Sequence, residues 1–592
     1  MNGDEEVVRI LLGRPDVNLQ CADQDARTLL SWASGNGHEG VVRILLERND
    51  CFHNTADRDN RTPLSWAAEN GHEGVVRILL ERNDVDPDTV DYDDRTPLSY
   101  AAVNGQEGVV RILLERNDVD PNKFDQIGRT PLLCAAENGH GGAVRILLER
   151  NDVDPELADD DARTPLSCAS GNGYEGVVRI LLERNDLDPN TSDKIDRTPL
   201  LWAAVNGREG VVRVLLGHRG VNPQCADQDA RTPLSWAAGN GHEGVVRILL
   251  ERDDVNPDIS DQGHRTPLLW AARRGHEGVV RMLLGHGGVN PQCADQGART
   301  PISWAAGNGH EGAVRTVLER NDVDPDTADR DTRIPLAWAA GNGHEGVLRM
   351  LLERRDVDPN TSDQNDRTPL AWAAGNGDEG MVRILLERSD VDPNTSDQND
   401  RTPLSRAAGN GHEGVVRMLL ERNDVDPDTP DHDGKTPLLW AAENVHDGVV
   451  RMLLERGGVD LDKTDKRRRS LIWWVARYGR NDLLSILVER VDIDLNICDE
   501  DGHSPLSMAV QYGHEEAVEL LVEQGDVDPD TADDVGRTPQ LWAVALQNMT
   551  IIDLVLQGIR LASKNGTYVP RRRNGELIQY LLRRCKPSQR AS

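Results

Sequence analysis

The sequence predicts an all-α solenoid, built from about sixteen to seventeen helix-turn-helix units with hairpin-like turns between them. Three observations support this prediction: one four-residue motif recurs at a fixed spacing, each interval holds two short amphipathic segments, and the chain is poor in large core residues. Only 38% of the 592 residues are apolar and only 4% are aromatic. Many small stacked cores suit this composition better than one large core.

The recurrent motif is Arg-Thr-Pro-Leu or a close variant, and its first residue, called here the frame residue, returns every 34 residues. Sixteen repeats are therefore in phase. The frame residues are Arg27, Arg61, Arg95, Arg129, Arg163, Arg197, Arg231, Arg265, Arg299, Arg333, Arg367, Arg401, Lys435, Arg469, His503 and Arg537.

One repeat, residues 61–94, shows why helices are expected. Thr62 is a helix cap and Pro63 suits the first helical position, where no amide donor is needed. Gly71 ends this first helix because glycine tolerates the left-handed conformation. A second helix is expected over residues 72–82, with apolar residues at helical spacing. Residues 83–94 are polar and rich in aspartate, which predicts a hairpin-like turn. Helices this short are marginal alone, so each repeat must pack against its neighbours.

The pattern Thr-Pro-Leu-x-x-Ala-Ala, then Gly-His, then Val-Val-x-x-Leu-Leu, resembles the ankyrin repeat, whose signature is T-P-L-H-x-A at period 33. The resemblance covers residues 1 to about 557. It implies a binding scaffold that uses turn tips and first helices. The period here is one residue longer, and the signature histidine is replaced by residues such as Ser65, Leu133 and Ala337. The threonine–histidine hydrogen bonding of the family is thus absent, and serine replaces it only in part. The repeat style is also similar to ankyrin arrays of filamentous fungi, which often follow a nucleotide-binding domain of the NACHT type.

Three regions are expected: a partial N-terminal ankyrin repeat at 1–26, the array at 27–557, and a divergent C-terminal capping segment with a basic tail at 558–592. Residues 2–9 match residues 36–43 one period later, so the chain begins in the middle of a repeat. One hypothesis is that Met1 is an internal start with more protein upstream. The alternative is that residues 1–26 pack as a minimal cap.

The formal charge of -34 argues against nucleic acid and anionic membranes as partners, because their binding needs basic contacts. It favours a protein partner with a basic surface, or serves only solubility. The N-terminus lacks the basic start of a signal peptide, and no apolar run approaches 18 residues. A monomer in the cytoplasm is expected, with the nucleus possible. Residues 466–469 and 571–573 are basic runs that suit either nuclear import or a solvated turn, the latter being favoured.

The eight cysteines show no CxxC spacing. Cys21, Cys225 and Cys293 share one repeat position, which copying of repeats explains better than disulfide pairing. A reduced, intracellular setting is predicted.

A column of tryptophans shares one position on the first helix, five residues after the frame residue. Core packing is the favoured interpretation, and a ligand-binding aromatic ladder is the alternative. Arg406 stands in this column as a charge, and a weak joint is predicted near residue 406 because burying an unpaired charge is costly. The column consists of Trp32, Trp66, Tyr100, Cys134, Cys168, Trp202, Trp236, Trp270, Trp304, Trp338, Trp372, Arg406, Trp440, Trp474, Met508 and Trp542.

Histidines recur at the start of the second helix, and an aspartate recurs four residues before the frame residue. Histidines one repeat apart are too distant to share a zinc ion, so helix-start roles are predicted. The aspartates lack the glycine and glutamate of an EF-hand loop, so turn formation is favoured over calcium binding, with weak cation binding left open. No catalytic motif is present. The prediction is no catalytic residue, no metal, no cofactor and no enzyme.

Positions that vary between repeats are the candidate partner-binding residues, and neutral drift is the alternative explanation of their variation. Aromatic residues and arginine are favoured among them because these residue types dominate interface energetics. The candidates lie at the turn tips and at the ends of first helices, and Tyr92, Ile127 and Ile195 are the favoured hot spots. The leading function is recognition of a protein partner on the concave surface and the turn tips, and its extension is the role of recognition arm in a larger signalling protein. A structural spacer without a specific partner is the alternative. The candidates are Tyr92, Val103, Gln126, Ile127, Lys194, Ile195, Val205, Arg273 and Arg274.

Overall fold

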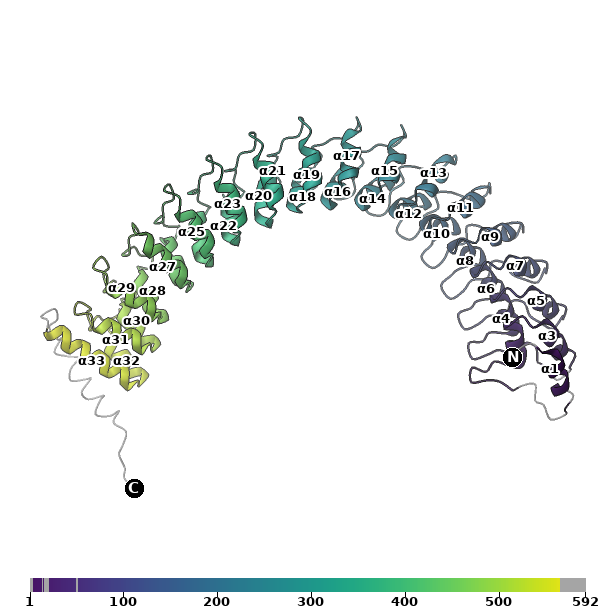
Figure 1. The fold of residues 1–592 in the computed structure, drawn as a ribbon, viewed down its shortest axis with the longest axis horizontal. Coiled ribbons are helices and arrows are strands. Elements are labelled where there is room, and N and C mark those ends of the chain that lie inside the picture. Colours follow the sequence, from purple (N-terminus) through teal and green to yellow (C-terminus); the bar gives the residue numbers. More distant parts are fainter. Residues whose placement is uncertain (1–3, 13, 15–20, 49–51, 565–592) are drawn as a thin grey trace, which may run out of the picture. The chain divides into compact units, whose positions relative to one another are not determined.

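The protein's structure is a computed structural model that describes residues 4–12, 14, 21–48 and 52–564. These residues form 33 α-helices, and the only β-structure among them is two isolated bridges. The all-α repeat prediction is confirmed (Figure 1). Sixteen helix pairs, α2–α3 to α32–α33, follow the single helix α1. Over the same residues, no helix combines the length and apolar character needed to cross a membrane.

The chain divides into two compact units, and each is described by itself. The N-terminal unit contains Met1–Gln296 and Glu319–Val323. Its first helices are α2 (Leu29–Gly35), α4 (Pro63–Glu69), α6 (Pro97–Val103), α8 (Pro131–Glu137), α10 (Pro165–Asn172), α12 (Pro199–Val205), α14 (Pro233–Asn240) and α16 (Pro267–Arg274). Its second helices are α1 (Glu5–Leu12), α3 (Glu39–Leu46), α5 (Glu73–Leu80), α7 (Glu107–Leu114), α9 (Gly141–Leu148), α11 (Glu175–Leu182), α13 (Glu209–Gly217), α15 (Glu243–Leu250) and α17 (Glu277–Gly285).

The C-terminal unit contains Gly297–Leu318 and Asp324–Ser592. Its first helices are α18 (Pro301–Gly307), α20 (Pro335–Asn342), α22 (Pro369–Asn376), α24 (Pro403–Asn410), α26 (Pro437–Glu443), α28 (Leu471–Tyr478), α30 (Pro505–Tyr512) and α32 (Pro539–Leu546). Its second helices are α19 (Glu311–Leu318), α21 (Glu345–Leu352), α23 (Glu379–Leu386), α25 (Glu413–Leu420), α27 (Asp447–Arg456), α29 (Asn481–Val488), α31 (Glu515–Val522) and α33 (Met549–Lys564).

In most repeats the first helix begins directly after a threonine that caps it. In α4, the Thr62 hydroxyl accepts a hydrogen bond from the backbone N–H of Ser65 at 3.2 Å, and Pro63 is the first helical residue. The hydroxyl oxygens of Thr62 and Ser65 are 3.1 Å apart. Serine therefore joins the threonine in the hydrogen bonding that the ankyrin signature assigns to histidine.

The turn between the two helices holds a glycine with positive φ in most repeats, whereas Val445 and Gln547 take this place in two of them. Gly37 has a φ of +73°, and a Cβ atom there would lie 2.6 Å from Nδ1 of His72 in the next repeat. His72 precedes α5, and its Nε2 lies 3.0 Å from the carbonyl oxygen of Gly35. The helix-start prediction for the histidine column is confirmed, and the His72 ring also links its repeat to the one before it.

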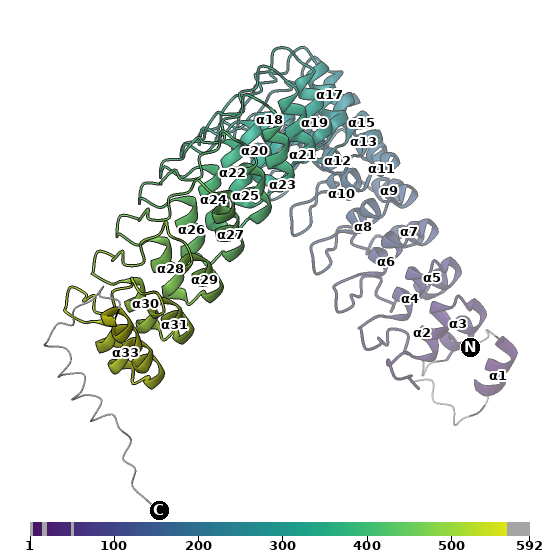
Figure 2. The ribbon, with the colours of Figure 1, turned by 60° about the vertical axis from the view of Figure 1, so that its left-hand side comes forward.

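The core lies between the two helices of each repeat and those of its neighbours. In the second described repeat, Leu64, Ala67, Val75, Val76 and Leu79 are all at most 1% exposed. Within each compact unit, first helices pack on first helices and second helices on second helices. The turns lie on one side, the first helices in the middle and the second helices on the other side (Figure 2). Stability is therefore a sum over neighbouring repeats.

The ends of the array show two details. Helix α1 packs against α3, and the Arg48 side chain donates to the carbonyl of Leu12 at 2.8 Å. Helix α33 continues without a break across the predicted boundary at 557/558. The basic run 571–573 lies outside the described residues, and the boundaries of the three regions stay predictions.

Candidate interaction surface

The recurrent aspartate builds each turn tip. Asp57 is 8% exposed, and its Oδ1 accepts the backbone N–H groups of Asp59 and Arg61 at 3.0 and 2.9 Å. The backbone N–H of Asp57 donates in turn to the carbonyl of Arg61 at 3.0 Å, which closes a hairpin-like tip. The turn-forming role predicted for these aspartates is confirmed.

The second carboxylate oxygen of the same aspartate accepts a hydrogen bond from the residue of the tryptophan column in its own repeat. The Trp66 indole Nε1–H donates to Asp57 Oδ2 at 2.9 Å. The Arg61 guanidinium lies 3.7 Å from the Trp66 ring centroid and 4.4 Å from the Tyr100 ring centroid. A frame arginine is thus stacked between the rings of its own and the following repeat, which is a cation–π arrangement.

The same alternation recurs in both compact units, and we call it the Arg–aromatic ladder: the frame residues and the rings of the tryptophan column. Arg231 lies 3.4 Å from Trp236 and 4.0 Å from Trp270, and burial lowers its pKa to about 10. Arg299 lies 4.8 Å from Trp304 and 4.5 Å from Trp338. The Arg231 guanidinium therefore remains charged at neutral pH.

The core-packing prediction for the tryptophans is only partly right. Trp270 and Trp474 are 8% and 3% exposed, whereas Trp32 is 39% exposed and most others are half-buried. Most of these indole N–H groups donate to the aspartate of the turn, as Trp66 does to Asp57 and Trp236 to Asp227. The ring therefore stands between helix and turn tip and not wholly between helices.

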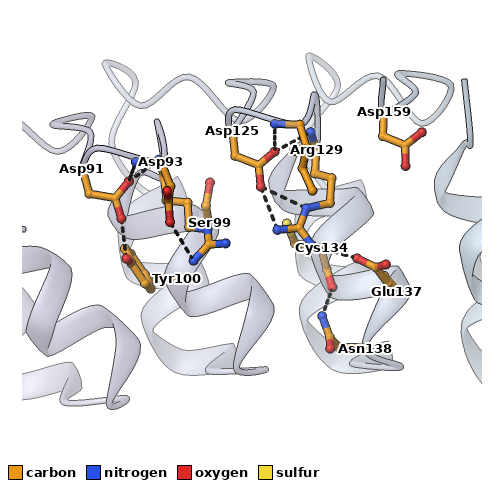
Figure 3. A network of polar contacts seen from close by, with 12 residues as sticks. Asp91, Asp93, Ser99, Tyr100, Asp125, Arg129, Cys134, Glu137, Asn138 and Asp159 are labelled. Atoms are coloured by element: carbon orange, nitrogen blue, oxygen red, sulfur yellow. Dashed lines mark hydrogen bonds and ion pairs between the residues drawn. The ribbon is translucent and has the colours of Figure 1, made fainter. Parts of the chain in front are cut away.

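The ladder lacks rings in two consecutive repeats, at Cys134 and Cys168. There the frame arginine folds back onto its own aspartate: Arg129 Nε donates to Asp125 Oδ2 at 3.0 Å and its Nη1 to Glu137 Oε2 at 3.1 Å (Figure 3). Figure 3 also shows the preceding repeat, where the Tyr100 hydroxyl donates a hydrogen bond to the Asp91 carboxylate.

The weak joint predicted at Arg406 rests on an unpaired charge, and that premise is wrong. The Arg406 guanidinium pairs with the carboxylate of Asp397, the group that accepts an indole N–H in other repeats. Burial lowers the pKa of Arg406, and the adjacent carboxylate opposes that effect. The turn aspartate thus supplies the counter-charge that the sequence pattern alone did not indicate.

The turn tips form a continuous strip in which each repeat donates one backbone hydrogen bond to the preceding one. Tyr92 N–H donates to the Asp59 carbonyl at 3.1 Å, and Gln126 N–H donates to the Asp93 carbonyl at 2.9 Å. The Gln126 side chain also donates to the Tyr92 carbonyl. The Ile127 carbonyl then accepts the next bond in the strip. Consecutive tips are therefore neighbours, and their side chains share one surface.

The predicted hot spots lie on this strip with exposed side chains. Tyr92, Ile127 and Ile195 are 67%, 50% and 41% exposed. Exposed carboxylates stand beside them, including Asp93 at 58% and Asp161 at 73% side-chain exposure. Gln126 and Lys194 are also exposed on the strip. The strip therefore combines apolar groups with negative charge.

The four first-helix candidates lie at helix ends where consecutive repeats are tied together. Val103 and Val205 are half-buried, and their carbonyls lie 2.9 Å from the Nε2 atoms of histidines one repeat later. The guanidinium of Arg273 is 5.4 Å from the Trp270 ring, and Arg274 donates to the Gly239 carbonyl at 3.0 Å. Each candidate thus has a structural contact, and a partner-binding role for it stays a prediction.

Two exposed aromatic residues were missed by comparing repeats. Phe52 and Phe124 are 66% and 45% exposed, and both lie in turns. They are the only phenylalanines in the chain. Phe124 directly precedes the recurrent Asp125, at a position that is alanine or serine in most repeats, and this difference was the available signal.

One cluster among the described residues has the spacing of metal ligands. Ligand atoms of Asp499, Asp501 and His503 lie within 4.8 Å of one another. However, Asp499 Oδ1 already accepts the backbone N–H groups of Asp501 and His503 at 3.1 and 2.7 Å. This is the recurrent turn, with an imidazole at the frame position in place of a guanidinium.

The thiols have structural surroundings. The six described cysteines are free, whereas Cys51 and Cys585 lie outside the described residues. Burial raises the pKa of Cys168 and Cys293 to about 12 and that of Cys225 to about 11. These thiols stay neutral and weakly reactive at physiological pH.

Comparison with known families identifies the repeat. A family model described as ankyrin repeats (3 copies) matches nine overlapping or consecutive segments: 1–91, 53–125, 83–159, 117–193, 151–227, 219–295, 287–363, 370–465 and 471–565. These segments cover most of the chain. No curated protein matches the chain.

Proposed function

This chain belongs to the ankyrin-repeat family, and we propose that it is a non-catalytic scaffold that binds a protein partner through its turn tips and first helices. Ankyrin repeats are in general protein–protein interaction modules. The observation that carries the proposal is the exposed side chains of Tyr92, Ile127 and Ile195 on one hydrogen-bonded strip. Exposed aromatic and aliphatic groups on a rigid support make interface hot spots at low entropic cost.

The partner that suits this strip has a basic surface. Exposed carboxylates of Asp93 and Asp161 flank the apolar side chains, and the whole chain carries a formal charge of -34. Opposite charges speed association and favour the correct partner. The proposal extends to a monomeric protein of the cytoplasm, or of the nucleus, that acts as the recognition arm of a signalling protein.

The test is affinity purification of partners with the wild-type chain and with a triple variant, Tyr92→Ala, Ile127→Ala and Ile195→Ala. Truncating hot spots costs on the order of 2 kcal/mol each, so binding should weaken at least tenfold. The matched control replaces Val491, which is 103% exposed and lies just after helix α29 and not at a turn tip, with alanine.

Partners captured by the wild type and the control but lost from the triple variant support recognition by the strip. Unchanged capture by all three proteins, with unchanged melting temperatures, rejects it and favours a structural spacer. A basic partner also predicts that association slows as salt is raised, because salt screens exposed charges.

A further inference from the structure

The Arg–aromatic ladder has a vacancy at Cys168, and a pocket lies there. Its volume is about 80 Å³, and its walls include Glu137, Arg163, Cys168 and Trp202. Eleven of the sixteen repeats place a tryptophan ring at the position of Cys168. The pocket thus lies at the column position where those repeats place an indole.

The chemistry around the vacancy is that of a ring site. In the order of the ladder, position 168 falls between the frame arginines Arg129 and Arg163. The face of an aromatic ring is negative, so a ring between two guanidinium groups is favourable. Burial raises the pKa of the Cys168 thiol to about 12, so the thiol adds no charge to the site.

A hydrogen-bond acceptor is also in place. Arg163 Nε donates to Asp159 Oδ2 at 2.9 Å, and Asp159 is 7% exposed. Asp159 Oδ2 can still accept a second hydrogen bond, because in another repeat one aspartate oxygen accepts from both an arginine and an indole. Asp261 Oδ2 accepts Arg265 Nε and Trp270 Nε1, each at 3.0 Å.

The repeat around Trp270 therefore serves as a template for the vacancy. With Arg265 folded onto its aspartate, its guanidinium still lies 4.4 Å from the Trp270 ring centroid. Arg163 holds the same pose on Asp159 without a ring beneath it. Most tryptophans of the ladder are only half-buried, so a ring bound from solvent needs only partial enclosure.

We infer that the pocket at Cys168 receives an aromatic side chain of the protein partner, one with an N–H or O–H donor such as tryptophan or tyrosine. The ring completes the ladder: it stacks against Arg163, lies beside Trp202, and donates to Asp159. This inference rests on the proposed function and assigns it an anchor site at the first helix α10. The tip strip and the pocket then bind separate parts of one partner.

The experiment uses the full chain and N-acetyl-tryptophanamide as the probe, with binding followed by saturation-transfer NMR. A ligand of this size should bind with a Kd on the order of 1 mM. N-acetyl-leucinamide, which lacks the ring and its donor, should bind at least tenfold more weakly.

Three variants locate the probe. Cys168→Trp fills the pocket from within, so it should abolish probe binding and raise the melting temperature by roughly 2–6 °C. Cys168→Ala keeps the pocket open and should bind the probe like the wild type. Arg163→Ala removes one cation and should weaken binding several-fold.

Binding by the wild type and Cys168→Ala, with loss in Cys168→Trp, supports the inference. No binding by the wild type at 10 times the expected Kd of about 1 mM, or equal binding by Cys168→Trp, overturns it. The tip variant with alanine at 92, 127 and 195 should bind the probe normally. If the probe does not bind at Cys168, the partner-capture test of the turn tips is unaffected. If the tip variant captures partners normally, the probe result can still be interpreted.

Discussion

The carboxylate of Asp326, which lies in one of the turns, should lower the free energy of unfolding, and replacing it with an amide should remove this loss. Asn360 sits in a turn where its Oδ1 accepts the Asp392 N–H at 2.8 Å and its Nδ2 donates to the Asp390 carbonyl at 2.7 Å. Asp326 occupies the same position one repeat earlier. Its Oδ2 accepts the Asp358 N–H at 2.9 Å, but its Oδ1 is buried without a hydrogen-bond partner.

The electrostatics agree with this geometry. Burial raises the pKa of Asp326, and the carboxylates of Asp324, Asp358 and Asp356 raise it further, while the Asp358 N–H opposes the rise. A raised folded-state pKa means that the native state binds the proton more tightly than the unfolded state. The penalty is therefore absent below the unfolded pKa of about 3.9 and fully present above the folded pKa.

The magnitude follows from the missing donor. An unsatisfied buried acceptor costs about 1–3 kcal/mol, and a new amide hydrogen bond contributes about 0.5–1.5 kcal/mol. The side chain is only half-buried, so solvent screening moves the sum toward the lower end. Asp326→Asn should raise the free energy of unfolding by about 1–2 kcal/mol at pH 7, or the melting temperature by roughly 2–8 °C.

The assay is urea and thermal unfolding followed by circular dichroism at pH 7 and pH 4. The gain should shrink at pH 4, where the wild-type carboxyl takes up its proton. Asn360→Asp is the matched reverse change and should destabilise by a similar amount. If Asp326→Asn is neutral or destabilising at pH 7 while Asn360→Asp destabilises, the unsatisfied oxygen is not the cause and the reasoning fails.

Two further changes test the ladder and the caps. Arg406→Trp should raise the free energy of unfolding by about 1–2 kcal/mol, because the indole N–H can donate to Asp397 as it does to the equivalent aspartate in other repeats, and no half-buried guanidinium remains; Arg406→Ala should lower it by about 3 kcal/mol, because the buried Asp397 carboxylate loses its partner and gains no donor. Earlier urea unfolding of Arg406→Trp than of wild type would contradict this. Thr368→Val should cost about 1 kcal/mol in the same assay, since the hydroxyl that accepts the Ala371 N–H at 3.2 Å is lost. Thr395→Val, whose hydroxyl makes only a long exposed bond to the Asp392 carbonyl, is its control, and equal losses in both variants would reject the cap argument.

Local sequence predicted the elements well because local chemistry decides them. Thr62, Pro63 and Gly71 each act within one turn of chain, so the boundaries of α4 followed directly. The turn role of Asp57 also followed, because its Oδ1 bonds only to backbone two and four residues away.

The candidate surface was predicted less fully. Variation between repeats selected Tyr92 and Ile127, which are exposed, but it missed Phe124 and the pocket at Cys168. A small residue in a column of large ones does not by itself predict a pocket, because the side chains that would line the pocket belong in part to the next repeat. Trp202, which forms a wall of that pocket, lies 34 residues later in the chain.

The sequence by itself determined the period, the helix pairs, the caps and the turns, because each depends on residues within one repeat. Only the tertiary structure decided how the charges are partnered: Arg61 between two rings, Arg406 on Asp397, and Asp326 with one oxygen unpaired. These outcomes depend on where a flexible side chain points and on what the neighbouring repeat presents to it. A pattern of residue types fixes neither, since the same aspartate accepts an indole, a guanidinium or a phenol according to the residue that packing places beside it.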